Sequence, residues 1–270
     1  MTTAPTDNVI LSTRKGAALW ITIHREERRN AMNPQVLAGI EQAVRAARAD
    51  SGIRVLVLTG AGPKAFCAGA DLSRGTGVFS DGLDEPTTDF GRLARVVRET
   101  GLPMIARVNG DCVAGGMALM SLCDLAVVAE HARFGLPEAK VGVFPMQVLV
   151  FLRKMIHPRH VNELCLTGGL IDARRAEAMG IANEVVPAAG LDAAVDALVA
   201  RICAVSPVAL RRGKVAIAAM ESMGWHEALS YAETQIAVAS GTSDAREGLA
   251  AFNEKRPPRW AAQPTKGNTP

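Results

Sequence analysis

Apolar and polar residues alternate with the period of a β-strand at the start of the chain. Residues 9–13 and 17–24 both alternate in this way, on either side of Lys15-Gly16, which predicts a β-hairpin. The period becomes helical after Asn33-Pro34, an N-cap residue followed by the proline that helices accept in their first turn. The helix predicted from there to near Gly52 has one apolar face, made by Val36, Leu37, Ile40, Val44 and Ala47.

Three short apolar runs further on predict buried strands at residues 55–59, 104–108 and 125–129. Helical patterns at 89–99 and 117–122 lie between them. Apolar strands that alternate with helices are typical of buried parallel sheets, so the predicted fold class is α/β. Residues 73–88 are rich in Gly, Asp, Thr and Ser and show little periodicity, which predicts a mobile lid or loop.

The rest of the chain is mostly helical, apart from a short strand at 181–186. Helices are predicted at 147–156, 160–166, 173–179 (with Asp172 as N-cap and Gly180 as stop), 191–204, 208–220, 225–240 and 243–254. We divide the chain into a core of residues 1–204 and a helical C-terminal region of residues 205–270. The C-terminal helices are amphipathic, which predicts either an oligomerisation arm or packing against the same chain.

Composition excludes several classes of function. The 270 residues are 49% hydrophobic and carry a net charge of +3, with Lys and Arg scattered, so neither nucleic acid nor a membrane surface is an expected partner. No apolar stretch is long enough to span a bilayer, and residues 1–8 do not resemble a signal peptide, which predicts a cytoplasmic protein. Five cysteines without CxxC spacing indicate neither a disulfide framework nor a metal site.

Small residues gather at two strand-to-loop junctions, in segments 55–72 and 107–124. The first turns through Gly60-Ala61-Gly62-Pro63, and the second reaches Ala114-Gly115-Gly116 in front of an apolar helix. Backbone N–H groups at such junctions lack partners, and those at a helix start lie at the positive end of its dipole. The two junctions therefore suit an anion or a developing oxyanion.

Two other readings of the motifs are disfavoured. Residues 60–65 fit the dinucleotide fingerprint GxGxxA, but Pro63 and the loop-like residues 66–71 do not open a helix, which argues against a nicotinamide enzyme. A serine nucleophile is disfavoured because GxSxG is absent and the five histidines form no motif.

A series of short motifs runs along nearly the whole chain: RNAM at 29–32, AFCAGADL at 65–72, VNG at 108–110, AGG at 114–116, CD at 123–124, FGLPE at 134–138, LTG at 166–168, VVP at 185–187 and EG at 247–248. In this order they resemble the crotonase superfamily, the enoyl-CoA hydratase/isomerase family. The resemblance implies a crotonase-like spiral of repeated β-β-α units with a helical C-terminal region. It also implies a homotrimer or a dimer of trimers.

The resemblance implies the site as well. In that family an acyl-CoA thioester carbonyl binds between two backbone N–H groups, which map onto Ala70 and Gly115, and a catalytic carboxylate maps onto Glu138. Coenzyme A is then part of the substrate, with no separate cofactor. Its contacts are expected from Arg28, Arg29, Lys64, Ala68, Asp71 and Leu72, and from Phe252 and Lys255 of a neighbouring subunit.

The residues around Glu138 agree with a catalytic role. It follows Leu136-Pro137 and precedes the apolar Val141, Val143 and Phe144, so partial desolvation should raise its pKa and make it a better base near neutrality. The acyl pocket is expected to be lined by Met117, Phe144, Met146, Val148 and residues of the 73–88 loop.

One departure from the family matters for the reaction. Hydratases of the family carry a second Glu where this chain has Ala118, and dienoyl isomerases and aryl-CoA dehalogenases have an Asp where it has Met146. Hydration needs one group to activate water and another to protonate C2, whereas a double-bond shift needs one base. The sequence therefore favours a single-Glu enoyl-CoA isomerase, with an enoyl-CoA hydratase and a non-catalytic acyl-CoA binder as alternatives.

Overall fold

The computed structural model describes residues 8–73, 75 and 87–261. Most of the predicted 73–88 loop, and most of the Pro-rich tail, therefore lie outside the described residues.

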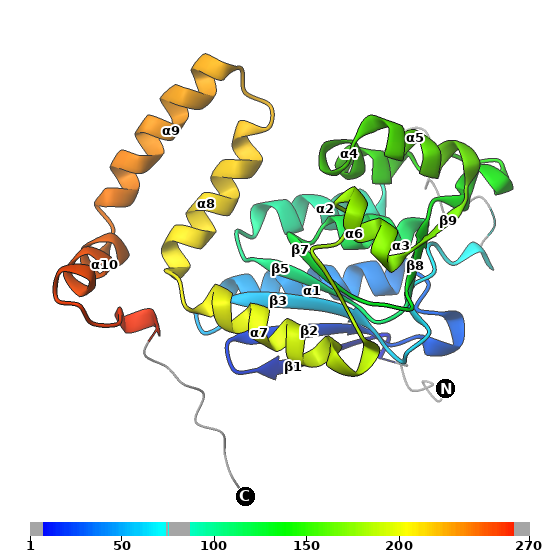
Figure 1. Ribbon diagram of the computed structural model, residues 1–270, viewed down its shortest axis with the longest axis horizontal. Coiled ribbons are helices and arrows are strands. Elements are labelled where there is room, and N and C mark those ends of the chain that lie inside the picture. The colour runs from blue at the N-terminus through cyan, green and yellow to red at the C-terminus, as the bar shows by residue number, and fades with distance from the viewer. Residues whose placement is uncertain (1–7, 74, 76–86, 262–270) are drawn as a thin grey trace, which may run out of the picture.

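The chain repeats one unit, a strand, a second strand and a helix, along its first half (Figure 1). The units are β1 (Ile10–Lys15), β2 (Ala18–Ile23) and α1 (Pro34–Ala49); β3 (Val55–Gly60), β4 (Ala65–Cys67) and α2 (Asp89–Glu99); β5 (Met104–Val108), β6 (Asp111–Val113) and α3 (Gly115–Ser121). β7 (Leu125–Ala129) and β8 (Arg133–Gly135) begin a fourth unit, which continues into the 3-10 helix η3 (Pro137–Val141) and α4 (Met146–Met155). The predicted β-β-α repeat is confirmed.

Each unit from the second to the fourth gives one strand to each of two sheets. The six-stranded sheet has the order β1-β2-β3-β5-β7-β10, where β10 is Glu184–Val186, and is parallel except for the β1–β2 hairpin. The second sheet has the order β4-β6-β8-β9, with β9 (Leu170–Asp172) antiparallel to β8. The chain thus advances as a spiral, and the predicted α/β class is confirmed.

The prediction of residues 66–71 as loop was wrong in part, because β4 extends to Cys67. The segment after Asn109, also predicted as loop, contains β6. Strands of three residues are too short to show an alternating pattern, and their pairing is set by the neighbouring turns of the spiral.

Two buried asparagines hold the corner at which the chain crosses from β3 to the second sheet. The Asn30 side chain donates to the carbonyl oxygens of Ala61 and Ala65 at 2.9 and 2.7 Å. Asn109 accepts from the Gly60 N–H at 3.1 Å and donates to the Gly62 and Ala65 carbonyls. A Cβ at Gly60 would lie 2.5 Å from the Ala65 and Phe66 oxygens, so the corner closes only around glycine. These bonds satisfy polar backbone that would otherwise be buried without partners.

The six-stranded sheet separates two apolar layers. Leu56, Leu58 and Met104 point into the main core with the apolar faces of α1 and α2, whereas Trp20, Val57 and Ile105 pack against α7 (Leu191–Cys203). α1 begins as predicted, with the Asn33 side chain accepting from the Val36 N–H and Pro34 in the first turn. The central strands β3, β5 and β7 are covered on both faces, which is why they are largely apolar.

The elements between α4 and α7 complete the core. They are α5 (Pro158–Thr167), β9, α6 (Ala173–Met179), β10 (Glu184–Val186) and the 3-10 helix η4 (Ala188–Gly190). Asp172 caps α6 as predicted, accepting from the Arg175 N–H at 2.8 Å, and Gly180 ends it with a φ of 86°. β9 was not predicted.

Three helices then lead away from the two sheets (Figure 1). They are α8 (Pro207–Met220), α9 (Trp225–Ser240) and α10 (Ser243–Asn253), followed by η5 (Arg259–Ala261), and we call residues 207–253 the C-terminal arm. Lys214 ties α8 to the core through Asp124 at 2.7 Å, and Arg54 donates to the carbonyls of Val205 and Trp260. The boundary predicted at 204–205 falls between α7 and α8, and the division into two domains stays a prediction.

Among the described helices no single one is long and apolar enough to cross a membrane. The consecutive helical segments 188–203 and 207–220 are long and apolar enough only when they are taken together, and their axes are bent by 99° relative to each other.

Candidate active site

A cavity of about 1000 Å³ lies where three segments meet. It is bounded by the turn after β4, by the start of α3, and by η3 with the residues that lead into α4. Ala70, Gly115 and Glu138, which are far apart in the sequence, all line it. The two junctions and the carboxylate singled out in the sequence are therefore brought together.

The orientation of the Ala70 N–H follows from backbone pairing. Met32 and Ala70 form a parallel bridge, in which the Met32 N–H donates to the Gly69 carbonyl at 2.8 Å and the Asp71 N–H donates to the Met32 carbonyl at 2.7 Å. In extended backbone, successive N–H groups point to opposite sides, so the Ala70 N–H points away from Met32. It has no hydrogen-bond partner among the described residues.

Gly115 lies on that other side. Ala114, the residue before it, has φ 52° and ψ −129°, a conformation that costs a non-glycine residue about 1–3 kcal/mol. Its N–H donates to the Gly135 carbonyl at 2.9 Å, which holds this turn against β8. A Cβ at Gly115 would lie 3.6 Å from the Ala70 nitrogen, and the Gly115 N–H also lacks a partner in the described part of the chain. Two unpaired N–H groups therefore lie side by side, one of them at the first residue of α3.

The α3 start requires a second glycine. A Cβ at Gly116 would overlap the Cys67 carbonyl oxygen, so only glycine lets α3 approach β4 closely. This close packing fixes the distance between the two junctions.

Glu138 lies in η3 beside the cavity, and its Oε2 is buried without a hydrogen-bond partner in the described structure. Burial raises the pKa of this carboxyl above its ordinary value of 4.5, although a bond from its own backbone N–H acts in the opposite direction. The predicted direction of the shift is confirmed. An oxygen that is desolvated and unpaired is well suited to accept a proton.

Position 118 contributes no polar group to the cavity. Ala118 is 2% exposed and lies in the wall of the cavity. The other carboxylates that line the cavity are already engaged, because Asp71 pairs with Arg25 and Asp89 pairs with Arg92. Among the described lining residues, Glu138 is the carboxylate with an unpartnered buried oxygen.

The predicted CoA contacts fall into two sets. Ala68, Asp71 and Leu72 line the cavity, whereas Arg28, Arg29 and Lys64 are exposed and outside its lining. Phe252 lies at the far end of the C-terminal arm and is 81% exposed, and Lys255 follows just after the arm.

The predicted acyl pocket needs one correction. Phe144, Met146 and Val148 line the cavity, but Met117 is fully buried and does not. It points into the core together with the other apolar side chains of α3, and Ala118 takes the place in the wall.

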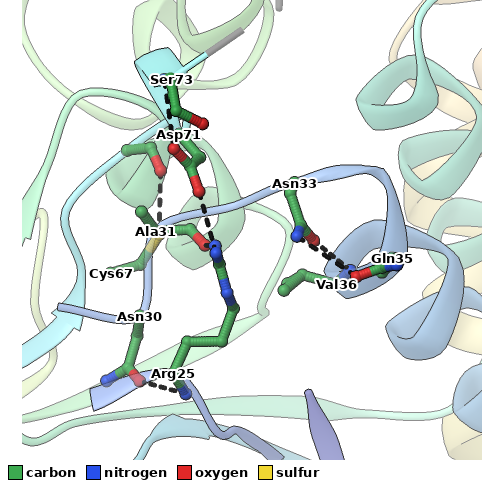
Figure 2. A network of polar contacts seen from close by, with 10 residues as sticks. Arg25, Asn30, Ala31, Asn33, Gln35, Val36, Cys67, Asp71 and Ser73 are labelled. Atoms are coloured by element: carbon green, nitrogen blue, oxygen red, sulfur yellow. Dashed lines mark hydrogen bonds and ion pairs between the residues drawn. The ribbon is translucent and has the colours of Figure 1, made fainter. Parts of the chain in front are cut away.

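Sequence analysis missed Arg25, which lines the cavity beside Asp71. Figure 2 shows its guanidinium between the Ala31 carbonyl and the Asp71 carboxylate, to which it donates at 2.6 and 2.9 Å. Hydrogen bonds from Ser73 and Arg25 lower the pKa of Asp71 to about 2, so this carboxylate is charged at neutral pH. The only signal in the sequence was a third arginine in HREERRNAM, next to the two that were selected.

The described residues contain no group of three or more His, Cys, Asp or Glu side chains that could hold a metal ion.

Known proteins resemble this chain over most of its length. The family model described as enoyl-CoA hydratase/isomerase matches residues 13–263. A putative enoyl-CoA hydratase of Thermus thermophilus is 36% identical over 254 residues, which cover 93% of this chain and all of that protein. A crotonyl-CoA hydratase of Syntrophomonas wolfei is 31% identical, with 93% of this chain and 96% of that protein covered. The crystal structure of an enoyl-CoA hydratase from Mycobacterium smegmatis superposes with a TM-score of 0.85 at 30% identity, over 93% of this chain and 98% of that one.

The raised pKa of Glu138 predicts a gain of stability when its charge is removed. Between the ordinary value of 4.5 and the raised value, the folded state binds more protons than the unfolded state, so stability falls as pH rises through this window. Glu138→Gln cannot ionise. We expect it to unfold at a higher urea concentration than wild type at about pH 8, with a difference that shrinks toward about pH 5.

Glu247→Gln is the control of opposite sign. Arg256 bonds Glu247 at 2.7 Å and, with the Arg259 N–H, lowers its pKa to about 2, so this substitution should reduce stability at about pH 8. If Glu138→Gln is destabilising at that pH, as Glu247→Gln is, this contradicts the claim that the charged Glu138 side chain is buried without a partner.

Proposed function

Because the chain belongs to the enoyl-CoA hydratase/isomerase family, we propose that it is an enzyme that converts enoyl-CoA thioesters through an enolate. The observation that carries the proposal is the pair of N–H groups of Ala70 and Gly115 beside the buried Oε2 of Glu138, all three without a partner among the described residues. A thioester carbonyl that accepts from both N–H groups becomes more polarised as negative charge develops on it. One such donor typically contributes about 10²–10³ in rate.

Glu138 is the proposed base. It takes a proton from C2 of a 3-enoyl thioester, the electron pair moves into the carbonyl, and the resulting dienolate oxygen is held by Ala70 and Gly115. The protonated Glu138 then returns the proton at C4, which leaves the double bond between C2 and C3. One carboxylate is sufficient for this isomerisation, and the apolar Ala118 supports it over hydration.

Hydration is the second candidate, and the names of the relatives favour it. The Thermus thermophilus and Syntrophomonas wolfei proteins are called hydratases, at 36% and 31% identity. Adding water to a 2-enoyl thioester requires that a water be activated for attack on C3 while C2 receives a proton. With alanine at 118, Glu138 would have to do this with a water held by other groups.

The surroundings of the cavity suggest where coenzyme A binds. The Ala68 N–H donates to the Arg29 carbonyl at 3.0 Å, so Arg28 and Arg29 follow the edge of the cavity. Asn30 joins this segment to the loop that carries Lys64. We propose that Arg28, Arg29 and the backbone around Ala68 hold the adenine end of coenzyme A, that Lys64 lies near its phosphates, and that Leu72 lies along its thiol arm.

The C-terminal arm suggests how the protein assembles. No residue of α8 or α9 is buried, and the arm exposes large apolar side chains: Ile217, Trp225, Leu229, Ile236, Leu249 and Phe252. Exposed apolar surface of this kind marks an interface. We propose that a trimer, or a dimer of trimers, covers the arm and brings Phe252 and Lys255 to a neighbouring cavity.

The reaction is tested with a 3-enoyl-CoA and a 2-enoyl-CoA given separately, by following the absorbance of the conjugated thioester. We expect the 3-enoyl substrate to gain conjugation, and Glu138→Gln to lower kcat by about 10²–10⁴-fold because it removes the base. Affinity for a saturated acyl-CoA should survive. Glu130→Gln, an exposed carboxylate outside the cavity lining, is the control and should behave as wild type. A wild type that binds acyl-CoA without turnover of either substrate would be a binder rather than an enzyme.

Restoring a carboxylate at position 118 distinguishes the two reactions. We expect Ala118→Glu to acquire hydration of the 2-enoyl substrate, because the new side chain can hold a water at the cavity wall. Ala118→Gln has the same shape but no base, and it should not acquire this activity. Rapid hydration by the wild type would contradict the one-base mechanism and support the hydratase.

The assembly is tested by sedimentation. We expect a mass about three or six times 28.5 kDa, and Ile236→Asp in the arm should shift it toward the monomer by placing a charge in the apolar interface. Leu11→Asp, at an exposed position of β1 outside the arm, should leave the mass unchanged. A wild type that is monomeric at micromolar concentration would contradict the proposal.

A further inference from the structure

We infer that Arg25 is a positioning residue that, through Asp71, holds the Ala70 N–H in the direction needed to bind the thioester oxygen. The inference rests on the proposed function, since it assigns a role within the same site. It differs from the CoA contact first expected for Asp71.

The guanidinium joins the two backbone segments that form the Met32–Ala70 bridge. One nitrogen, Nη1, donates to the Ala31 carbonyl at 2.6 Å, next to Met32, and Nη2 donates to Asp71 Oδ2 at 2.9 Å, next to Ala70. Figure 2 shows this arrangement. One side chain thus clamps both sides of a bridge that consists of a single residue pair.

Asp71 holds its own turn as well. Its Oδ1 accepts from the Ser73 N–H at 3.2 Å, and its backbone N–H donates to Met32. Both carboxylate oxygens therefore have partners within the protein, and both side chains are largely buried, with 14% of Arg25 and 16% of Asp71 exposed. A pair satisfied in this way is suited to hold backbone in place rather than to bind a ligand.

The Ala70 peptide needs such a clamp. Gly69, immediately before it, has a φ of 98°, where glycine is free to adopt other conformations. An isolated bridge does not gain the cooperative support of a longer ladder. If the segment rotated, the Ala70 N–H would turn away from Gly115, and a misplacement of about 1 Å at a reacting centre can cost about 10²-fold in rate.

Arg25→Met, which keeps an unbranched apolar stem but none of the donors, tests the inference on the complete protein. We expect kcat for the 3-enoyl-CoA, or for the 2-enoyl-CoA if that is the substrate, to fall about 10–100-fold, with KM close to wild type. Arg25→Lys keeps the charge with a single nitrogen and should recover part of kcat. Asp71→Asn keeps the shape of the carboxylate but not its charge, and it should also lower kcat. This variant provides the test of the inference if Arg25→Met does not fold.

A spectroscopic measurement separates positioning from general damage. A bound conjugated dienoyl-CoA absorbs at longer wavelength when its carbonyl is polarised by the two N–H groups. We expect this shift in wild type, and a smaller shift in Arg25→Met and Asp71→Asn at saturating ligand.

Arg14→Met is the matched control. Arg14 also donates to one aspartate, Asp50, at 3.1 Å and to one backbone carbonyl, that of Gly16, at 3.0 Å, but the pair is exposed and outside the cavity lining. It should keep the wild-type kcat and spectral shift.

The inference is overturned if Arg25→Met and Asp71→Asn keep the wild-type kcat and shift, or if they weaken acyl-CoA binding while the shift is unchanged. In both cases the wild type still binds and turns over enoyl-CoA. A wild type that does neither contradicts the proposed function itself, which is a distinguishable result.

Discussion

The pairing of Met32 with the backbone of Gly69 and Asp71 is the interaction on which the cavity depends. It joins the first turn of the spiral to the second at the point where the chain leaves β4. By engaging the N–H groups on one side, it leaves the Ala70 N–H pointing to the other, toward Gly115. Asn30 and Asn109 complete the same corner by satisfying the carbonyls of the preceding loop. The N–H groups of Ala70 and Gly115 have no partner in the described part of the chain, and both residues line the cavity.

Several features of the cavity lower the stability of the folded protein. Ala114 has a strained backbone conformation, and within the described structure Glu138 Oε2 and the N–H groups of Ala70 and Gly115 have no partner. The surrounding structure holds the strain in place, because Gly135 bonds the Ala114 N–H and the Cys67 carbonyl packs against Gly116. Strained backbone and polar groups without hydrogen-bond partners are expected at binding sites, where ligand atoms supply the missing partners.

Much of the fold follows from local patterns. β3, β5 and β7 are apolar because both faces of the sheet are covered, and Asn33, Asp172 and Gly180 mark helix ends by their own chemistry. β4, β6 and β9 have three residues each, so their pairing depends on neighbouring turns rather than on their own sequence. At the site, the resemblance selected Ala70, Gly115 and Glu138, which share one cavity, and their roles stay predictions. Arg25 escaped notice because its partner is 46 residues away, and Met117 was misplaced because the direction of a side chain depends on where its helix begins.

Position 118 shows why membership of the family does not by itself give the reaction. The N–H groups of Ala70 and Gly115, which we propose stabilise an enolate, are backbone groups, so substitutions that preserve the two junctions would keep them. What happens to that enolate depends on side chains that can change without disturbing the fold. Ala118 is buried in the cavity wall, in the middle of the short helix α3. In the proposed mechanism the scaffold supplies the common enolate intermediate, and the number of carboxylates around it would determine whether a proton is moved along the acyl chain or water is added.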